Sequence, residues 1–282
     1  MTNDKIAVLG AGQMGNGIAH VFAQAGFPVT MIDVSRDALA KGRDTIAKNL
    51  DRQVKKGTLT AEDGEKSLGR VSTADAMDAV SGASVVIEAV TENRDLKFSI
   101  FSDIDRLSGE GAILATNTSS ISITEIAART KRPDKVIGMH FMNPVPVMQL
   151  VEVIRGLATS DATTQRTVGL ATAVGKTAVE ANDYPGFIAN RILMPMINEA
   201  VYCLMESVGS AEAIDTVMKL GMNHPMGPLQ LADFIGLDTC LAILQVLHDG
   251  LGDPKYRPCP LLRKYVAAGW LGKKSGRGFY TY

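Results

Sequence analysis

The chain has 282 residues and a formal net charge of −1; 46% of its residues are hydrophobic and 21% are charged. Such a chain is too apolar for disorder and long enough for one large or two ordinary domains. Its near-neutral charge favours neither nucleic acid nor an anionic membrane as a partner. The widely spaced cysteines Cys203, Cys240 and Cys259 favour reduced thiols over a disulfide framework or a metal site. The chain enters a predicted strand at once and has no apolar run of membrane length, so we expect a soluble, cytoplasmic protein.

The first stretch of the chain has the pattern of a strand, a glycine-rich turn and a helix. Apolar residues 6–9 predict a buried strand, and a helical pattern runs from 14 to about 25. In the G-x-G-x-x-G turn between them, the first glycine allows a tight turn, the second lets backbone approach a pyrophosphate, and the third lets helix and strand pack closely. We expect the turn and the helix N-terminus to bind a dinucleotide. The expected contacts are Gly10, Gly12, Gln13, Met14 and Gly15.

An acidic residue follows the second predicted strand, which covers residues 28–32. This residue, Asp33, lies about twenty positions beyond the glycines, where an acid binds the ribose hydroxyls of the adenosine. Arg36 could accommodate a 2′-phosphate, but Asp33 would repel one, so we predict NAD rather than NADP. The alternative is a strand, turn and helix that bind no ligand.

Strand and helix signals then alternate, which predicts a Rossmann-type, doubly wound and mostly parallel α/β sheet. Further strands are expected at 71–73, 85–90, 113–116, 136–140, 150–155 and 177–181, and the main helices at 36–56, 94–107, 123–129 and 161–175. Beyond residues 182–186 only helical patterns recur, at 187–207, 211–220, 229–249 and 261–268. We therefore predict a nucleotide-binding domain over 1–184 and a smaller all-helical domain over 185–282. Segment 187–208 is apolar nearly all round, which predicts burial on several sides and a homodimer interface.

In open α/β sheets, ligands bind at the carboxyl ends of the strands. Residues 89–92, 116–120 and 140–144 follow three predicted strands, and the next strand contributes Glu152. His140 is the candidate general base at this edge, and a nearby carboxylate would orient it and stabilise its protonated form. Beside a nicotinamide, such a pair suits the oxidation of a secondary alcohol. The alternatives are a structural histidine, a Glu152 that forms a salt bridge with Arg155, and a Ser119 that only makes a turn.

Several motifs together carry a family resemblance. They are the glycine turn, Asn117-Thr118-Ser119-Ser120, His140-Phe141-Met142-Asn143-Pro144 and Asp183-Tyr184-Pro185-Gly186-Phe187-Ile188-Ala189-Asn190-Arg191. In this order and spacing, the chain resembles the L-3-hydroxyacyl-CoA dehydrogenases, above all the short bacterial members that act on 3-hydroxybutyryl-CoA. The resemblance runs from residue 5 to residue 280, essentially the whole chain.

The resemblance implies a role for each matching residue. His140 would be the base and Glu152 its partner, while Ser119 and Asn190 would hold the substrate oxygens. The cofactor would be lined by Glu92, Lys97, Asn117, Ser119, Asn143 and Lys274, in addition to the glycine turn and Asp33. Arg52 and Lys56 match positions that touch the CoA moiety; members often carry lysine at the first, and arginine changes the contact geometry.

Two other functions compete with this reading. One is a β-hydroxyacid dehydrogenase of the 6-phosphogluconate or hydroxyisobutyrate type, which has a similar domain order but a catalytic lysine. The other is a non-catalytic, crystallin-like protein that binds NAD. The joint presence of His140, Glu152, Ser119 and Asn190 favours an acyl-CoA dehydrogenase over both.

Overall fold

The computed structural model describes residues 4–282. The chain forms two compact units that divide between Asp183 and Tyr184. The first is a Rossmann-type domain built on an eight-stranded, mostly parallel sheet, and the second is helical. The predicted fold class is confirmed.

The sheet has the order β3-β2-β1-β4-β5-β6-β7-β8. All neighbouring strands are parallel except β6 and β7, which are antiparallel. The strands are β1 (Ile6–Leu9), β2 (Val29–Ile32), β3 (Val71–Ala74), β4 (Val85–Glu88), β5 (Ile113–Thr116), β6 (Val136–Phe141), β7 (Leu150–Arg155) and β8 (Thr177–Asn182). Strands buried on both faces need continuous apolar runs, and β1, β4, β5 and β6 are buried throughout.

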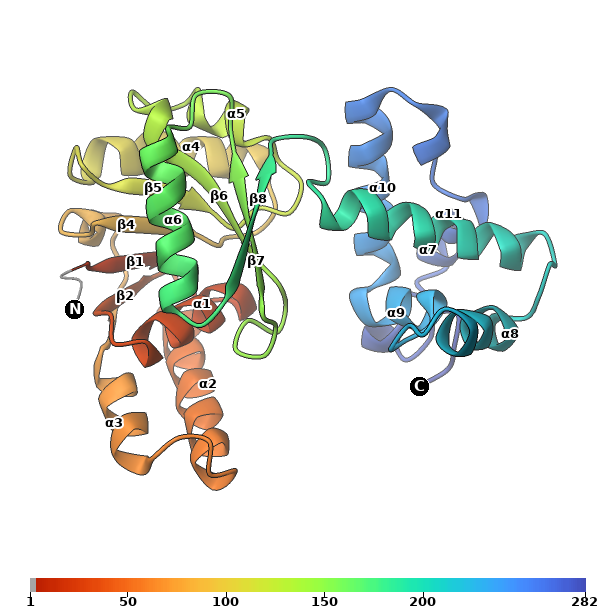
Figure 1. Ribbon diagram of the computed structural model, residues 1–282, viewed down its shortest axis with the longest axis horizontal. Helices are drawn as coiled ribbons and strands as arrows, with labels where there is room; N and C mark the ends of the chain where they lie inside the picture. Colours follow the sequence, from red (N-terminus) through yellow and green to blue (C-terminus); the bar gives the residue numbers. More distant parts are fainter. Residues whose placement is uncertain (1–3) are drawn as a thin grey trace. The chain divides into compact units, whose positions relative to one another are not determined.

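Helices cover both faces of this sheet, with α1 and α6 on one face and α4 and α5 on the other (Figure 1). The helical segments of this domain are α1 (Gln13–Gln24), α2 (Arg36–Lys55), α3 (Ala61–Gly69), η1 (Met77–Val80), α4 (Arg94–Leu107), α5 (Ile123–Ala127), η2 (Pro133–Lys135) and α6 (Asp161–Ala173). Side-chain caps begin several of them; Ser35 accepts the Ala38 N–H at the start of α2. The Phe22 ring on α1 meets the Phe141 ring on β6 edge-on, with 6.4 Å between centroids. This packing holds α1 against the strand that carries His140.

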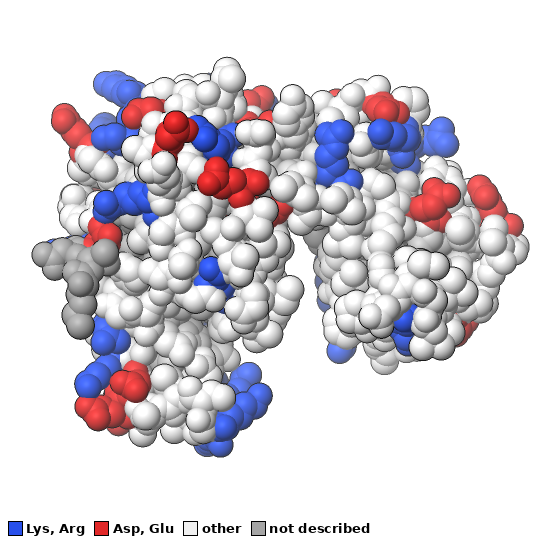
Figure 2. Space-filling model, viewed as in Figure 1, with Lys and Arg blue, Asp and Glu red and all other residues white. Residues whose placement is uncertain are grey.

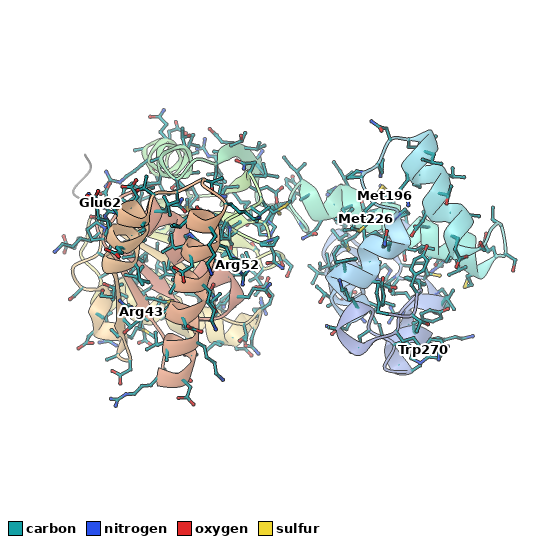
Figure 3. The ribbon with its side chains drawn as sticks, turned by 90° about the horizontal axis from the view of Figure 1, so that it is seen from below. Arg43, Arg52, Glu62, Met196, Met226 and Trp270 are labelled. Carbon is teal, nitrogen blue, oxygen red and sulfur yellow. The ribbon has the colours of Figure 1, made fainter. Side chains whose placement is uncertain are left out.

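Helices α2 and α3 pair as a hairpin that extends beyond the sheet (Figure 1). Basic and acidic side chains both lie at its far end (Figure 2); Arg52 and Lys55 belong to the last turn of α2, and Glu62 and Asp63 to the first turn of α3. Arg52 lies on the side of the hairpin away from Glu62 of α3 (Figure 3). The exposed Arg52 side chain therefore lies away from the acidic start of α3.

The second domain consists of α7 (Ala189–Met205), α8 (Ala211–Thr216), η3 (Val217–Gly221), α9 (Pro228–Ile235), α10 (Leu237–Leu251), η4 (Pro254–Tyr256), α11 (Pro260–Ala267) and η5 (Lys273–Ser275). The expectation of one helix over 229–249 is wrong, because Gly236 adopts φ +101° and the chain turns by 98° between α9 and α10. Continuous apolar periodicity on both sides of this glycine conceals the break. Within residues 4–282 no single helix is long and apolar enough to span a membrane; α9 and α10 pass that test only as a bent pair.

Segment 187–208, which contains α7, is buried on only one side by its own domain, so its predicted burial on several sides stays a prediction that depends on a second copy. Met194, Ile197 and Val201 are buried in the helical core, but Ile192 is 68% exposed and Val208 is 72% exposed. The small domain covers one face of the apolar segment and leaves the other without cover from its own helices.

Candidate active site

His140 and Glu152 are directly paired across strands β6 and β7. The imidazole Nδ1 lies 2.8 Å from a carboxylate oxygen of Glu152, and the two residues are only 8% and 1% exposed. A carboxylate accepts, so Nδ1–H donates and the second ring nitrogen, Nε2, carries the basic lone pair. An oriented imidazole with a buried carboxylate behind it is the arrangement of a general base.

The alternative partner for Glu152 does not hold in this structure. Arg155 instead donates to the Asp161 carboxylate and to the Thr159 carbonyl, at 2.5 Å and 3.2 Å. The rule that ligand-binding residues lie at the carboxyl ends of parallel strands does not explain how Glu152 comes to face His140. Because β7 runs antiparallel to β6, Glu152 faces His140 through strand register and not from a shared carboxyl edge.

The loop after β5 is bonded to the strand that carries His140. The Asn117 side-chain oxygen accepts the Phe141 N–H at 2.8 Å, one residue beyond the histidine. Ser119 follows two residues later in the same loop, and its backbone N–H donates to Glu92 at 3.0 Å. The predicted residues Glu92, Asn117 and Ser119 thus lie together at this edge of the sheet.

Glu92 organises the whole turn with one carboxylate oxygen. Its Oε1 accepts the Thr118 hydroxyl at 2.5 Å, the Ser120 hydroxyl at 2.9 Å and the Ser120 N–H at 3.1 Å. Burial raises the pKa of this carboxyl, but the Lys97 ammonium and these donors outweigh burial and hold the pKa below its ordinary value. Glu92 is therefore an anion that fixes the loop.

Lys97 lies beneath this loop, with 1% of its side chain exposed. Its ammonium is 2.6 Å from Glu88, the last residue of β4, which is fully buried. Glu88 is absent from the predicted site. A signal for it exists in the sequence, because a carboxylate closes the otherwise apolar strand Val85-Val86-Ile87-Glu88 and a buried charge needs a partner.

The glycine turn has the geometry that close backbone approach requires. Gly10 has φ +99°, and a Cβ there would lie 2.7 Å from the Ala89 carbonyl oxygen. A Cβ on Gly15 would lie 1.8 Å from the Gly10 oxygen, so only glycine lets α1 pack on the turn. A Cβ on Gly12 would meet nothing within 4 Å, which leaves the room that a pyrophosphate needs. These residues fit a dinucleotide.

Asp33 is fixed beside this turn by backbone donors. One carboxylate oxygen accepts the Ala11 N–H at 2.8 Å, and the other accepts the Ser35 N–H at 2.9 Å. Arg36 is 86% exposed and pairs with Asp75 at 2.6 Å. The acidic group that would meet a ribose is held in place, while the arginine that would meet a 2′-phosphate is engaged elsewhere.

Two pockets of this domain are lined by predicted site residues. The smaller, of about 480 Å³, is lined by Gly12, Gln13 and Asn143, and the Gln13 amide donates to the Asn143 side-chain oxygen at 3.0 Å. The larger, of about 900 Å³, is lined by both predicted CoA residues, Arg52 and Lys56. A large pocket with two exposed cations suits a phosphate-bearing ligand.

Two predicted site residues belong to the helical domain. Asn190 is 9% exposed in the first turn of α7. Lys274 pairs with Asp238 at 2.6 Å, and both side chains are partly exposed. Their roles toward substrate and cofactor stay predictions.

Comparison with known proteins identifies the family. The model of the NAD-binding domain of 3-hydroxyacyl-CoA dehydrogenases matches residues 5–184, and that of their C-terminal domain matches residues 186–282. A probable 3-hydroxybutyryl-CoA dehydrogenase of Bacillus subtilis is 61% identical over 99% of this chain and 97% of its own. The 3-hydroxybutyryl-CoA dehydrogenase of Bradyrhizobium diazoefficiens is 57% identical over 99% of this chain and 95% of its own.

A solved structure is also similar to this chain over its full length. The crystal structure of (S)-3-hydroxybutyryl-CoA dehydrogenase from Ralstonia eutropha matches with a TM-score of 0.97 and 52% identity, over 100% of this chain and 99% of that one. NAD is the cofactor that the matched nucleotide-binding domain takes. The chain belongs to the 3-hydroxyacyl-CoA dehydrogenase family.

Proposed function

We propose that this chain catalyses the reversible, NAD-dependent oxidation of short-chain (S)-3-hydroxyacyl-CoA, with 3-hydroxybutyryl-CoA and acetoacetyl-CoA as the substrate pair. The observation that carries the proposal is the buried hydrogen bond of 2.8 Å between His140 and Glu152, in a domain built for a dinucleotide. The names of the relatives that match over the full chain support the same substrate.

His140 is the general base in this mechanism. In the oxidising direction its Nε2 takes the proton of the C3 hydroxyl, and in the reducing direction it returns that proton. Glu152 keeps the ring in the tautomer that can accept at Nε2, and its charge stabilises the imidazolium. Ser119 and Asn190 donate hydrogen bonds to substrate oxygens, as the family resemblance implies. Bound NAD supplies the hydride acceptor.

The buried lysines argue against the lysine-dependent β-hydroxyacid dehydrogenases. Lys97 and Lys176 are buried in the described part of the Rossmann-type domain. Lys97 is paired with Glu88, and Lys176 donates to the carbonyls of Val145 and Met148 at 2.7 Å. Neither ammonium is placed as a base, whereas His140 is.

We further propose where the substrate's phosphates bind and how the protein occurs in the cell. The CoA phosphates bind in the pocket of about 900 Å³ beside Arg52 and Lys56. The protein works in the cytoplasm as a homodimer through its helical domain. The net charge of −1 supports the absence of nucleic-acid and membrane partners.

The decisive experiment follows NADH oxidation with acetoacetyl-CoA and, separately, with the free 3-oxo acid. We expect turnover with the thioester alone. His140→Gln should lower kcat by about 10²- to 10⁴-fold, the usual contribution of a general acid or base, while NADH binding survives. No turnover of the thioester by the wild type, or near-normal turnover by the variant, contradicts the proposal; NADH binding without any turnover favours the crystallin-like alternative.

A further inference from the structure

A buried ion pair, Glu88 with Lys97, lies directly under the loop that carries Ser119. Glu88 Oε1 lies 2.6 Å from the Lys97 ammonium and also accepts the Val90 N–H at 2.7 Å. Its other oxygen accepts the Thr116 hydroxyl at 2.7 Å, which ties β4 to β5. Glu88 is thus fixed at the ends of two central strands and cannot follow a movement of the loop.

Lys97, which is held by Glu88, is also in contact with Glu92. The ammonium lies 3.4 Å from Glu92 Oε2, and the opposite oxygen, Oε1, gathers the donors of residues 118–120. A continuous chain of charges therefore runs from Glu88 through Lys97 and Glu92 to the backbone of Ser119. Desolvation of two charges opposes folding, and the buried pair is a poor source of net stability on its own.

We propose that Glu88 and Lys97 are positioning residues, which hold Glu92 where it sets the Ser119 loop for turnover. This inference rests on the proposed function, because it assigns the pair to the same site. It differs from the family expectation for Lys97, which is a contact with the cofactor. A direct contact would act on NADH binding whether or not Ser119 is present, whereas a positioning role acts mainly on kcat and only through the Ser119 loop.

The neutral double variant Glu88→Gln/Lys97→Met distinguishes an effect of the ion pair on catalysis from an effect on the stability of the fold. It removes both charges of the fully buried pair, and Glu92, which loses its cation, is partly exposed and keeps its loop donors, so the melting temperature should exceed that of Glu88→Gln alone. If Lys97 positions Glu92, kcat with acetoacetyl-CoA should still fall at least about tenfold, and this loss should exceed any rise in the KM for NADH. Arg94→Met/Glu125→Gln, which removes an exposed ion pair between α4 and α5, should leave both constants unchanged.

A double-mutant cycle with Ser119→Ala tests the route through the loop. In the Ser119→Ala background, adding Glu88→Gln/Lys97→Met should lower kcat less than about twofold, because the residue being positioned is gone. Equal losses in both backgrounds, a double variant with wild-type kcat, or a raised KM for NADH with normal kcat would each overturn the inference. Wild-type turnover with acetoacetyl-CoA distinguishes these results from a failure of the proposed function itself, in which both proposals fall.

Discussion

At the scale of single residues, the charge of Glu152 can be tested apart from its shape. Glu152→Gln keeps an acceptor for His140 Nδ1–H but removes the charge that stabilises the imidazolium. We expect kcat to fall about 10²- to 10⁴-fold with the fold intact, measured by NADH oxidation with acetoacetyl-CoA. Glu180→Gln, an exposed carboxylate on the neighbouring strand β8, is the matched control and should keep wild-type kinetics. A Glu152 variant that turns over as fast as this control would remove the carboxylate from the mechanism.

The choice of NAD over NADP depends on Asp33, whose two oxygens are held by backbone N–H groups. We expect the wild type to have the higher kcat/KM with NADH, because the fixed carboxylate repels a 2′-phosphate. Asp33→Ser should reduce the preference at least about tenfold, one decade for a lost repulsion of about 1.4 kcal/mol. Arg36→Gln should leave the preference unchanged, since that guanidinium is paired with Asp75. Better use of NADPH than NADH by the wild type would contradict this assignment.

The residues that could be predicted from the sequence are those whose chemistry follows from position at a strand end. Asp33 and His140 lie where a strand stops, and the structure has them there. The pairing of Glu88 with Lys97 and that of Arg36 with Asp75 join side chains from different elements, which meet only in the folded chain. Periodicity carries no information on such pairs.

At the scale of elements, a histidine joins α1 to α2. The His20 Nε2 lies 3.1 Å from the Gln24 amide oxygen and 3.2 Å from the Gln53 amide nitrogen, and the ring is fully buried. Burial lowers the pKa of His20 below its ordinary 6.5, and the charge of Lys176 lowers it further, while the bond to Gln24 opposes the shift. The buried Nδ1 has no hydrogen-bond partner in the described chain, so protonation would bury a donor without an acceptor.

This predicts a pH dependence of stability. Because the folded-state pKa is lowered, the unfolded chain binds the proton more readily, and stability is lost as pH falls through 6.5 and below. His20→Gln keeps a polar side chain between the same neighbours but cannot titrate. Urea unfolding at several pH values should show a smaller loss of unfolding free energy on acidification for the variant than for the wild type. Parallel curves would mean that His20 does not couple to folding.

Apolar periodicity predicts most of the helices and strands correctly, but it misses two features of the fold. The direction of β7 could not be predicted, because a strand pattern is the same whichever way the strand runs. The break at Gly236 could not be predicted either, since a glycine inside a helical pattern is often tolerated. Both depend on tertiary packing: β7 pairs in register with His140, and α9 and α10 turn to close the helical core.

At the scale of the whole molecule, the helical domain leaves apolar surface that its own helices do not cover. Val217, Leu220 and Met222 are 59%, 81% and 61% exposed. Next to them, an apolar groove of about 480 Å³ runs between α7 and α8, lined by Met196 and Met218 among others (Met196 is labelled in Figure 3). Exposed apolar surface of this kind marks an interface, and burying each such side chain is worth about 1.5–3 kcal/mol.

We predict that a second copy of the chain covers this surface. Light scattering should give twice the chain mass of 30.0 kDa for the wild type. The double variant Val217→Glu/Leu220→Glu should shift the mass towards a single chain, because two carboxylates would have to be desolvated in the interface. Leu157→Glu is the control: this leucine is 90% exposed in the other domain, so its variant should stay dimeric. A wild type with the mass of one chain would show that the apolar face serves another purpose, and an unchanged mass in the double variant would place the interface elsewhere.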